Sequence, residues 1–121
     1  MGQGRGSARS ALVVGLAILC LLAIVQPTLA AVYNIGWSFN VNGARGKSFR
    51  AGDVLVFKYI KGQHNVVAVN GRGYASCSAP RGARTYSSGQ DRIKLTRGQN
   101  YFICSFPGHC GGGMKIAINA K

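Results

Sequence analysis

The chain has 121 residues, enough for one domain, and its 15 lysines and arginines face only two acidic residues, which gives a formal net charge of +13. A strongly basic surface attracts polyanions and repels other cations, and nucleic acid is the usual partner of such a domain. Here the basic residues are scattered singly from Arg45 to Lys121, without the aromatic spacing of a base-stacking platform, so the pattern argues against nucleic-acid binding.

The first thirty residues look like a secretory signal peptide rather than part of the domain. Arg5 and Arg9 form a basic start, residues 11–25 are apolar throughout, and the segment ends in small residues at Ala30. The apolar run is shorter than the roughly 20 residues that a membrane-spanning helix needs. We therefore expect cleavage after Ala30, with cleavage after Ala31 as the alternative, and a mature domain of 91 residues.

Residues 31–121 retain 13 lysines and arginines against the two acidic residues, a formal charge of +11. They lack the second apolar run of a lipid-anchor signal, and the chain has no Asn-x-Ser/Thr glycosylation site. We expect a secreted, soluble monomer with no membrane anchor. Outside the cell, an acidic polysaccharide or an anionic redox partner suits this charge better than nucleic acid. A cationic surface that serves only solubility is the alternative.

Short β-type runs separated by turn signals follow one another through the domain. They are rich in β-branched and aromatic residues, and pairs such as Asn42-Gly43 and Asn70-Gly71 bound them. The segment 74–90 is rich in Ser, Gly, Ala and Arg and is long for a hairpin loop. Without a helical period of useful length or an internal repeat, the pattern predicts an all-β sandwich. The predicted strands are 31–35, 54–60, 64–70, 93–95, 101–104 and 115–119.

Chemistry-bearing residues concentrate between Cys104 and Met114. A thiol, an imidazole and a thioether follow at equal steps at Cys104, His109 and Met114, and the only other histidine, His64, opens an earlier predicted strand. One Cys, two His and a weak axial Met make the trigonal site of a blue-copper electron-transfer centre. A loop of this length can fold its three donors onto one point, and its glycines and Pro107 suit the tight turns that this needs.

Two other kinds of site compete for these residues. Zinc also takes Cys and His, but a thioether is a poor zinc ligand and a fourth hard ligand is missing nearby. A nucleophilic enzyme could pair Cys104 or Cys110 with a histidine, but no orienting carboxylate follows either histidine. Catalysis also usually needs an open position, which two His, a Cys and a Met would fill. The sequence thus favours copper and argues against an enzyme.

The cysteines form an odd set once the signal peptide, with Cys20, is removed. Cys77, Cys104 and Cys110 remain, which in an oxidising compartment means one disulfide and one leftover thiol. The count alone leaves the pairing open. Cys104 follows the apolar run 101–103, as a ligand entering from a strand would, and a Cys77–Cys104 bridge with Cys110 free is the alternative.

Three stretches carry a resemblance to a known family: Gln63-His64-Asn65-Val66-Val67, Tyr101-Phe102-Ile103-Cys104-Ser105-Phe106-Pro107-Gly108-His109-Cys110 and Gly113-Met114-Lys115-Ile116-Ala117. The chain resembles the phytocyanins, and within them the plantacyanins, over nearly all of residues 31–121. The resemblance implies a Greek-key cupredoxin β-sandwich with its metal loops at one end. It implies one copper ion held by His64, Cys104, His109 and Met114, a Cys77–Cys110 disulfide, and an Asn65 that orients the ligands by hydrogen bonds.

The same resemblance implies a function. It predicts a type 1 copper protein that carries single electrons in the plant cell wall or apoplast, with His109 as the electron port. Its redox partner is not identified by the sequence, and acidic cell-wall polysaccharide suits the basic surface. The alternative is extracellular signalling or adhesion in plant reproduction, such as pollen-tube guidance, which would keep the same site. The other aromatic residues of interest are expected in the core: Tyr33, Trp37, Phe39, Phe102 and Phe106.

Overall fold

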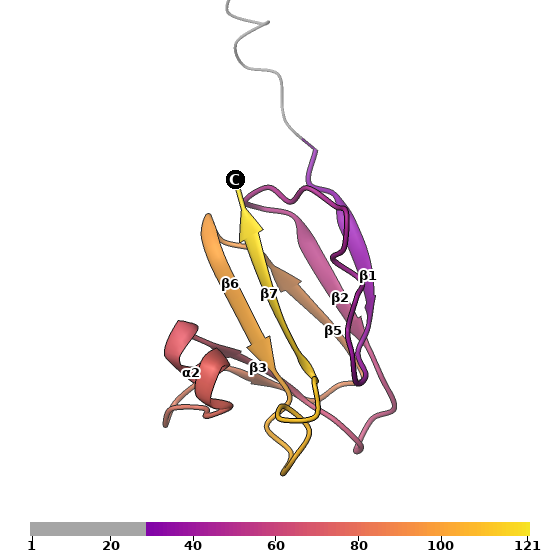
Figure 1. The fold of residues 1–121 in the computed structure, drawn as a ribbon. Helices are drawn as coiled ribbons and strands as arrows, with labels where there is room; N and C mark the ends of the chain where they lie inside the picture. The colour runs from indigo at the N-terminus through magenta and orange to yellow at the C-terminus, as the bar shows by residue number, and fades with distance from the viewer. Residues whose placement is uncertain (1–28) are drawn as a thin grey trace, which may run out of the picture.

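The computed structural model describes residues 29–121, which form two β-sheets packed as a sandwich (Figure 1). One sheet has the order β1-β2-β5 and the other β4-β3-β6-β7. The predicted all-β sandwich is therefore confirmed. Among the described residues, no helix is both long and apolar enough to cross a membrane. The strands are β1 (Val32–Gly36), β2 (Val54–Lys58), β3 (Val66–Val69), β4 (Thr85–Tyr86), β5 (Gln90–Lys94), β6 (Gly98–Ile103) and β7 (Lys115–Ala120).

The two sheets enclose an aromatic centre, and the strands differ in how much they bury: β2 buries three consecutive residues, Leu55, Val56 and Phe57. In β5 and β7 buried and exposed side chains alternate, as the two-residue period of a strand requires. The ring of Phe57 meets those of Trp37 and Phe102 edge-on, at centroid distances of 5.0 and 5.2 Å. Trp37 and Phe102 are thus core residues as predicted, while Tyr33 and Phe106 are half-buried and pack against the core.

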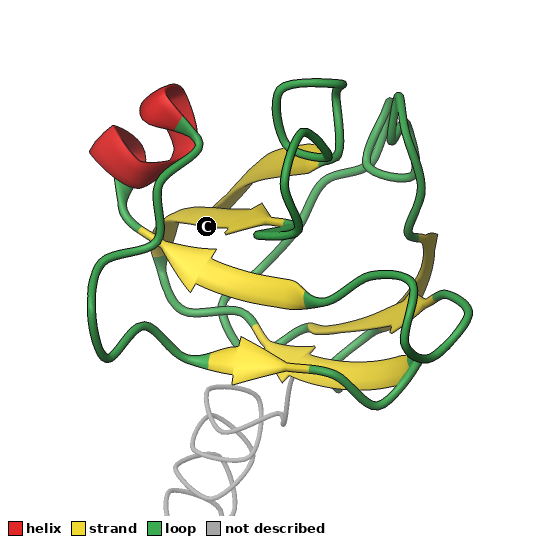
Figure 2. Cartoon of the chain, turned by 90° about the horizontal axis from the view of Figure 1, so that it is seen from below, coloured by secondary structure: helices red, strands yellow, loops and turns green. Residues whose placement is uncertain are grey.

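The loops that carry the predicted metal ligands lie at one end of the sandwich, and the termini of the described chain lie at the other. The loops 59–65 and 104–114 gather at one end, which we call the ligand end; it lies at the bottom of Figure 1 and is seen end-on in Figure 2. β1 runs parallel to β2, with Val32 beside Val54, and β7 runs away from the ligand end toward Lys121. Both ends of the described chain therefore meet at the opposite pole, which we call the terminal end.

Both acidic residues of the domain are buried, and each ties a turn together. The Asp53 carboxylate accepts a hydrogen bond from the backbone N–H of Ala31 at 3.0 Å. Asp91 accepts hydrogen bonds from the N–H of Ser88 at 3.0 Å and from the Tyr59 hydroxyl. Burial and, next, the hydrogen bond to Asp91 raise the pKa of Tyr59 to about 12, so its phenol stays protonated and donates.

The segment expected to be one long loop, 74–90, overlaps two short elements. Helix α2 (Gly71–Ser76) begins after Asn70, whose side-chain oxygen accepts a hydrogen bond from the Gly73 N–H at 2.9 Å, and it ends at Cys77 in the left-handed conformation. The Asn-Gly pair that predicted a turn is here a helix cap. A helix of six residues is too short to show a helical period, which is why the sequence did not reveal it.

The six predicted strands are all present, with ends displaced by up to three residues. β3 begins at Val66 rather than at His64, which lies in the preceding loop and forms an isolated β-bridge with Lys61. A fourth strand of that sheet, β4, was not predicted, because two residues carry too little pattern to recognise.

Candidate metal centre

Three potential metal ligands come together at the ligand end: His64, Cys104 and His109. Their donor atoms all lie within 4.8 Å of one another. The Nδ1 atoms of the two imidazoles are 3.0 Å apart, and the Cys104 Sγ lies 3.5 Å from Nδ1 of His109. Two nitrogens and a sulfur from distant segments thus face a common point, which is the arrangement of a metal site.

Cys104 comes directly after β6 and is fully buried. Among residues 29–121 it is the cysteine that forms no disulfide. Its backbone N–H donates to the carbonyl of Met114 at 3.1 Å, which closes the loop 104–114 at its base. Since the thiolate is the form of cysteine that binds metals, a buried thiol beside imidazole nitrogens is placed for that role.

Backbone hydrogen bonds fold the loop 104–114 into successive tight turns. The N–H of His109 donates to the carbonyl of Phe106 at 3.1 Å, and the His109 carbonyl accepts from the N–H of Met114 at 3.0 Å. Gly108 and Gly113 have φ angles of 77° and 103°, a region that other residues rarely enter. His109 is therefore held on both sides by its own loop.

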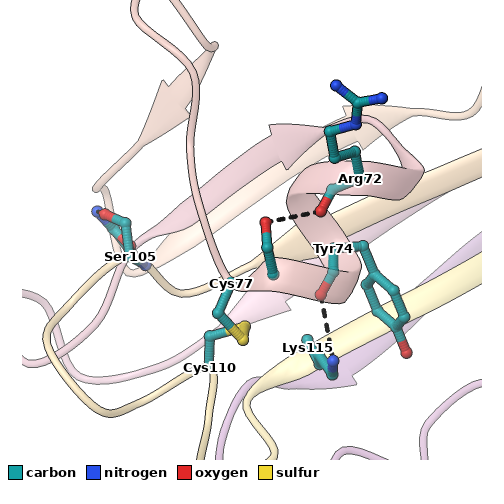
Figure 3. Close-up of a disulfide and its surroundings, with 8 residues drawn as sticks. Arg72, Tyr74, Cys77, Ser105, Cys110 and Lys115 are labelled. Carbon is teal, nitrogen blue, oxygen red and sulfur yellow. Dashed lines mark hydrogen bonds between the residues drawn. A yellow bond between two sulfur atoms is a disulfide. The ribbon is translucent and has the colours of Figure 1, made fainter.

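The Cys77–Cys110 disulfide ties this loop to the end of α2 (Figure 3). The pairing expected from the family resemblance is confirmed, and the alternative bridge to Cys104 is not formed. A second contact lies beside it: Lys115 Nζ donates to the carbonyl of Tyr74 at 3.1 Å and lies 4.4 Å from the centre of the Tyr74 ring. α2 is thus fastened both to the ligand loop and to β7.

His64 lies two residues before β3 and is half-buried. Burial and, next, the neighbouring His109 lower the pKa of His64. Both causes act against the charged imidazolium. The ring is therefore favoured in its neutral form, which is the form that binds a metal through a nitrogen.

Asn65 links the two segments that carry the metal-ligand candidates. Its side-chain amide donates to the Ser105 hydroxyl at 2.8 Å, and its side-chain oxygen accepts from the Ser105 N–H at 2.8 Å. The Asn65 carbonyl accepts a hydrogen bond from the indole N–H of Trp37 at 2.8 Å. The residue after His64 is therefore joined to the residue after Cys104 and to the core.

Met114 is fully buried and belongs to the main core cluster at the start of β7. Its backbone touches both partners in the loop, since its carbonyl accepts from Cys104 and its N–H donates to His109. The fourth residue of the predicted ligand set thus lies in the same loop and is bonded through its backbone to two of the other three.

Phe39 was expected in the core, and that prediction is wrong: its side chain is 46% exposed. Its ring lies edge-on to the imidazoles of His109 and His64, at centroid distances of 5.2 and 6.2 Å. A Cβ added to Gly112 would lie 2.9 Å from this ring, so a larger residue at position 112 would displace the Phe39 ring. Nothing in the sequence marked Phe39 as a neighbour of the site, because it reaches the site from a loop whose path only the fold defines. Ser105 directly follows Cys104, but its hydrogen bond to Asn65 was not predicted.

The donor set fits copper. A thiolate and two imidazole nitrogens are ligands that soft and borderline transition metals favour. The group His64, Cys104 and His109 contains no carboxylate to serve as a fourth zinc ligand or to orient a catalytic histidine.

Comparisons with known proteins agree with this geometry. The model of the plastocyanin-like domain family matches residues 35–114. The chain is 53% identical to chemocyanin from Lilium longiflorum, over 99% of each protein, and 56% identical to a basic blue protein from Cucumis sativus, over 74% of this chain and 99% of the relative. The solved structure of cucumber basic protein, a blue copper protein, superposes with a TM-score of 0.73 at 55% identity, covering 75% of this chain and all of that one.

Proposed function

This chain belongs to the plastocyanin-like blue copper proteins and, within them, to the phytocyanins, and we propose that it is a secreted carrier of single electrons in the extracellular space of a plant. Copper is its cofactor, and electron transfer is the general role of the family. The observation that carries the proposal is the convergence of His64, Cys104 and His109 at one end of a rigid sandwich. Secretion is proposed from the signal-like sequence of residues 1–30, nearly all of which lie outside the described residues.

We assign the ligand roles to His64, Cys104, His109 and Met114. Bound copper alternates between Cu(I) and Cu(II) and so takes up or releases one electron at a time. The chain would supply the thiolate of Cys104, one ring nitrogen each from His64 and His109, and the thioether of Met114 as a weak fourth ligand that tunes the potential. The Asn65–Ser105 link and the turns of the loop 104–114 support a site that keeps its shape when the charge changes.

The route of the electron is proposed to pass through His109. Its imidazole is half-buried, and the rings of Phe39 and Phe106 lie 5.2 and 5.6 Å from its own. Because Nδ1 of His109 faces the other donors, the opposite edge of the ring faces away from them. A redox partner that docks on the ligand end would approach this edge, and the aromatic rings would form an apolar rim around it.

We propose an electron carrier rather than an enzyme. Four protein ligands would fill the positions that a substrate needs at a catalytic metal. The thiolate of Cys104 would be engaged by the metal and would not serve as a nucleophile.

The test of the proposed function is to load the purified domain with Cu(II) and record its optical and paramagnetic-resonance spectra. We expect intense blue absorption, a narrow hyperfine splitting, and reversible one-electron voltammetry. A colourless protein after copper addition would overturn the proposal.

Voltammetry of Met114→Gln tests the proposed ligand role of Met114, because a lower potential with copper still bound is expected when the thioether is replaced by an amide oxygen.

A second candidate function is extracellular signalling or adhesion, through binding of acidic cell-wall polysaccharide. Its support is the 53% identity to the lily relative named chemocyanin and a group of cations around one cleft of the terminal end, far from the ligands. The cationic residues that line this cleft are Arg50, Lys94, Arg97 and Lys121. The two candidates separate in a polysaccharide-adhesion or pollen-tube assay of Cys104→Ser: full activity without the blue site would show that this role does not use electron transfer.

A further inference from the structure

The backbone at Ala31 is anchored to the fold in two places. Its N–H donates to Oδ1 of Asp53 at 3.0 Å, and its carbonyl accepts from the N–H of Val54 at 2.9 Å. Asp53 is buried, and its second oxygen accepts from the N–H of Arg50 at 2.8 Å. Both hydrogen bonds to this carboxylate thus come from uncharged backbone amides.

One residue earlier, the chain lies on the surface. Ala30 is exposed and Leu29 is 89% exposed. Cleavage between Ala30 and Ala31 would keep both anchoring groups, whereas cleavage after Ala31 would remove them. It would leave Asp53 with one fewer donor and the N–H of Val54 without its acceptor.

We propose that the chain is processed between Ala30 and Ala31 and that the new α-ammonium group of Ala31 forms an ion pair with the buried Asp53 carboxylate. This rests on the proposed secretion. Water hydrolyses the peptide bond: Ala30 leaves with the leader as a carboxylate, and the released amine of Ala31 takes up a proton. The donor at 3.0 Å from Asp53 Oδ1 changes from a neutral amide to an ammonium.

The change strengthens a contact that the fold already makes. The bond from the neutral amide to the carboxylate is already charge-assisted, and an ammonium at the same nitrogen, 3.0 Å from Oδ1 of Asp53, adds the Coulomb attraction between two opposite charges. The facing charges are Asp53 and, around the neighbouring cleft, Arg50, Lys94, Arg97 and Lys121. The cations oppose a further positive charge in this region, but the carboxylate is the group in direct contact. Cleavage between Ala30 and Ala31 therefore strengthens the attachment of the start of β1 to the turn before β2.

The site of processing is tested on the full chain, expressed with its own leader in secreting plant cells. Intact mass and N-terminal sequencing of the secreted protein should give Ala31 as the first residue. A secreted protein that begins at Val32, or elsewhere, overturns the inference. If the cells retain the chain with its leader uncleaved, the proposed secretion is contradicted instead. The ion pair is then tested on the purified chains described next.

The ion pair is tested with chains that start at Ala31 or at Ala30. Residues 31–121 contain every strand and the disulfide of the described structure, and 75% of this chain covers the whole of the solved cucumber basic protein. The equilibrium constant for unfolding should be about tenfold smaller for the chain that starts at Ala31 than for the chain that starts at Ala30. This corresponds to a stability difference of ~1.4 kcal/mol. In the Asp53→Asn background the difference should vanish; equal stabilities with Asp53 intact overturn the ion pair.

A second measurement serves if Asp53→Asn fails to fold. NMR titration of the Ala31 amine should give a pKa higher than that of the Ala30 amine in the longer chain, because the carboxylate favours the charged form. A raised pKa makes the added stability present at lower pH and lost as the pH rises through it. Equal pKa values of the two amines overturn the ion pair.

Discussion

The ligand end and the terminal end of the sandwich are held by different means. At the ligand end, residues 40 positions apart are joined by hydrogen bonds, because the Asn65 side chain contacts both the hydroxyl and the backbone N–H of Ser105. At the terminal end, one carboxylate, Asp53, gathers the backbone amides of Ala31 and Arg50. The first arrangement fixes the positions of donor atoms, and the second fixes only the path of the chain. Substitutions at the two ends should therefore separate the spectrum of the site from the stability of the fold.

The largest effect is expected from Cys104→Ser. Because Cys104 Sγ is the proposed thiolate donor, the blue absorption should disappear completely, while the circular dichroism of the sandwich stays the same. Optical titration with Cu(II) measures the loss. An unchanged blue spectrum would contradict the assigned role of Cys104 and would place the metal elsewhere.

Removal of the disulfide should act on stability instead. In the double variant Cys77→Ser with Cys110→Ser, the 33-residue loop is no longer closed in the unfolded chain, which costs about 3–4 kcal/mol in the chain-entropy model. Thermal unfolding measures the loss. The folded fraction should still turn blue with copper. A disulfide found at Cys104 by peptide mapping of the native protein would overturn the pairing on which this rests.

Asn65→Ala should affect both properties. Loss of its two hydrogen bonds to Ser105 should cost about 1–2 kcal/mol and shift the reduction potential, because the segments of His64 and Cys104 are no longer joined. Denaturation and voltammetry measure the two effects. Ser105→Ala is the matched control, since it removes the hydroxyl contact and keeps the backbone one. Equal effects of the two variants would show that the Asn65 side-chain oxygen contributes nothing.

The smallest stability change, under about 1 kcal/mol, is expected from Phe39→Ala, because the ring is half-exposed. The rate of electron exchange should nevertheless change, since the ring lies edge-on to both imidazoles. Val32→Ala is the control: Val32 is 52% exposed but lies at the terminal end. If both variants exchange electrons at the rate of the unaltered protein, Phe39 has no part in the route.

Much of the site could be predicted because its signal is local. Cys104, His109 and Met114 stand in one loop, and the strand on either side has a readable pattern. The sandwich followed from six predicted strand runs separated by turn signals, but α2 and β4 are too short to produce a period. The Cys77–Cys110 pairing came from family resemblance, since a count of three cysteines allows more than one bridge.

The contacts that support the site could not be predicted from local sequence patterns. Phe39 is a large apolar residue of the kind expected in a core, and only the course of the loop after Trp37 brings its ring edge-on to the two histidines. The bond between Asn65 and Ser105 joins positions 40 apart that carry no shared pattern. No sequence pattern marked Asp53, whose carboxylate is buried and accepts a hydrogen bond from the start of the domain at Ala31.

The parallel pairing of β1 with β2 has a practical consequence. Because β1 starts beside Val54 and β7 finishes beside Gly98, a linker joined to either end of the domain emerges at the pole away from His64 and His109 (Figure 1). The protein could be tethered to an electrode or fused to another domain through either end. Each attachment would hold the imidazoles outward, so that a film of such molecules would share one orientation toward the solution.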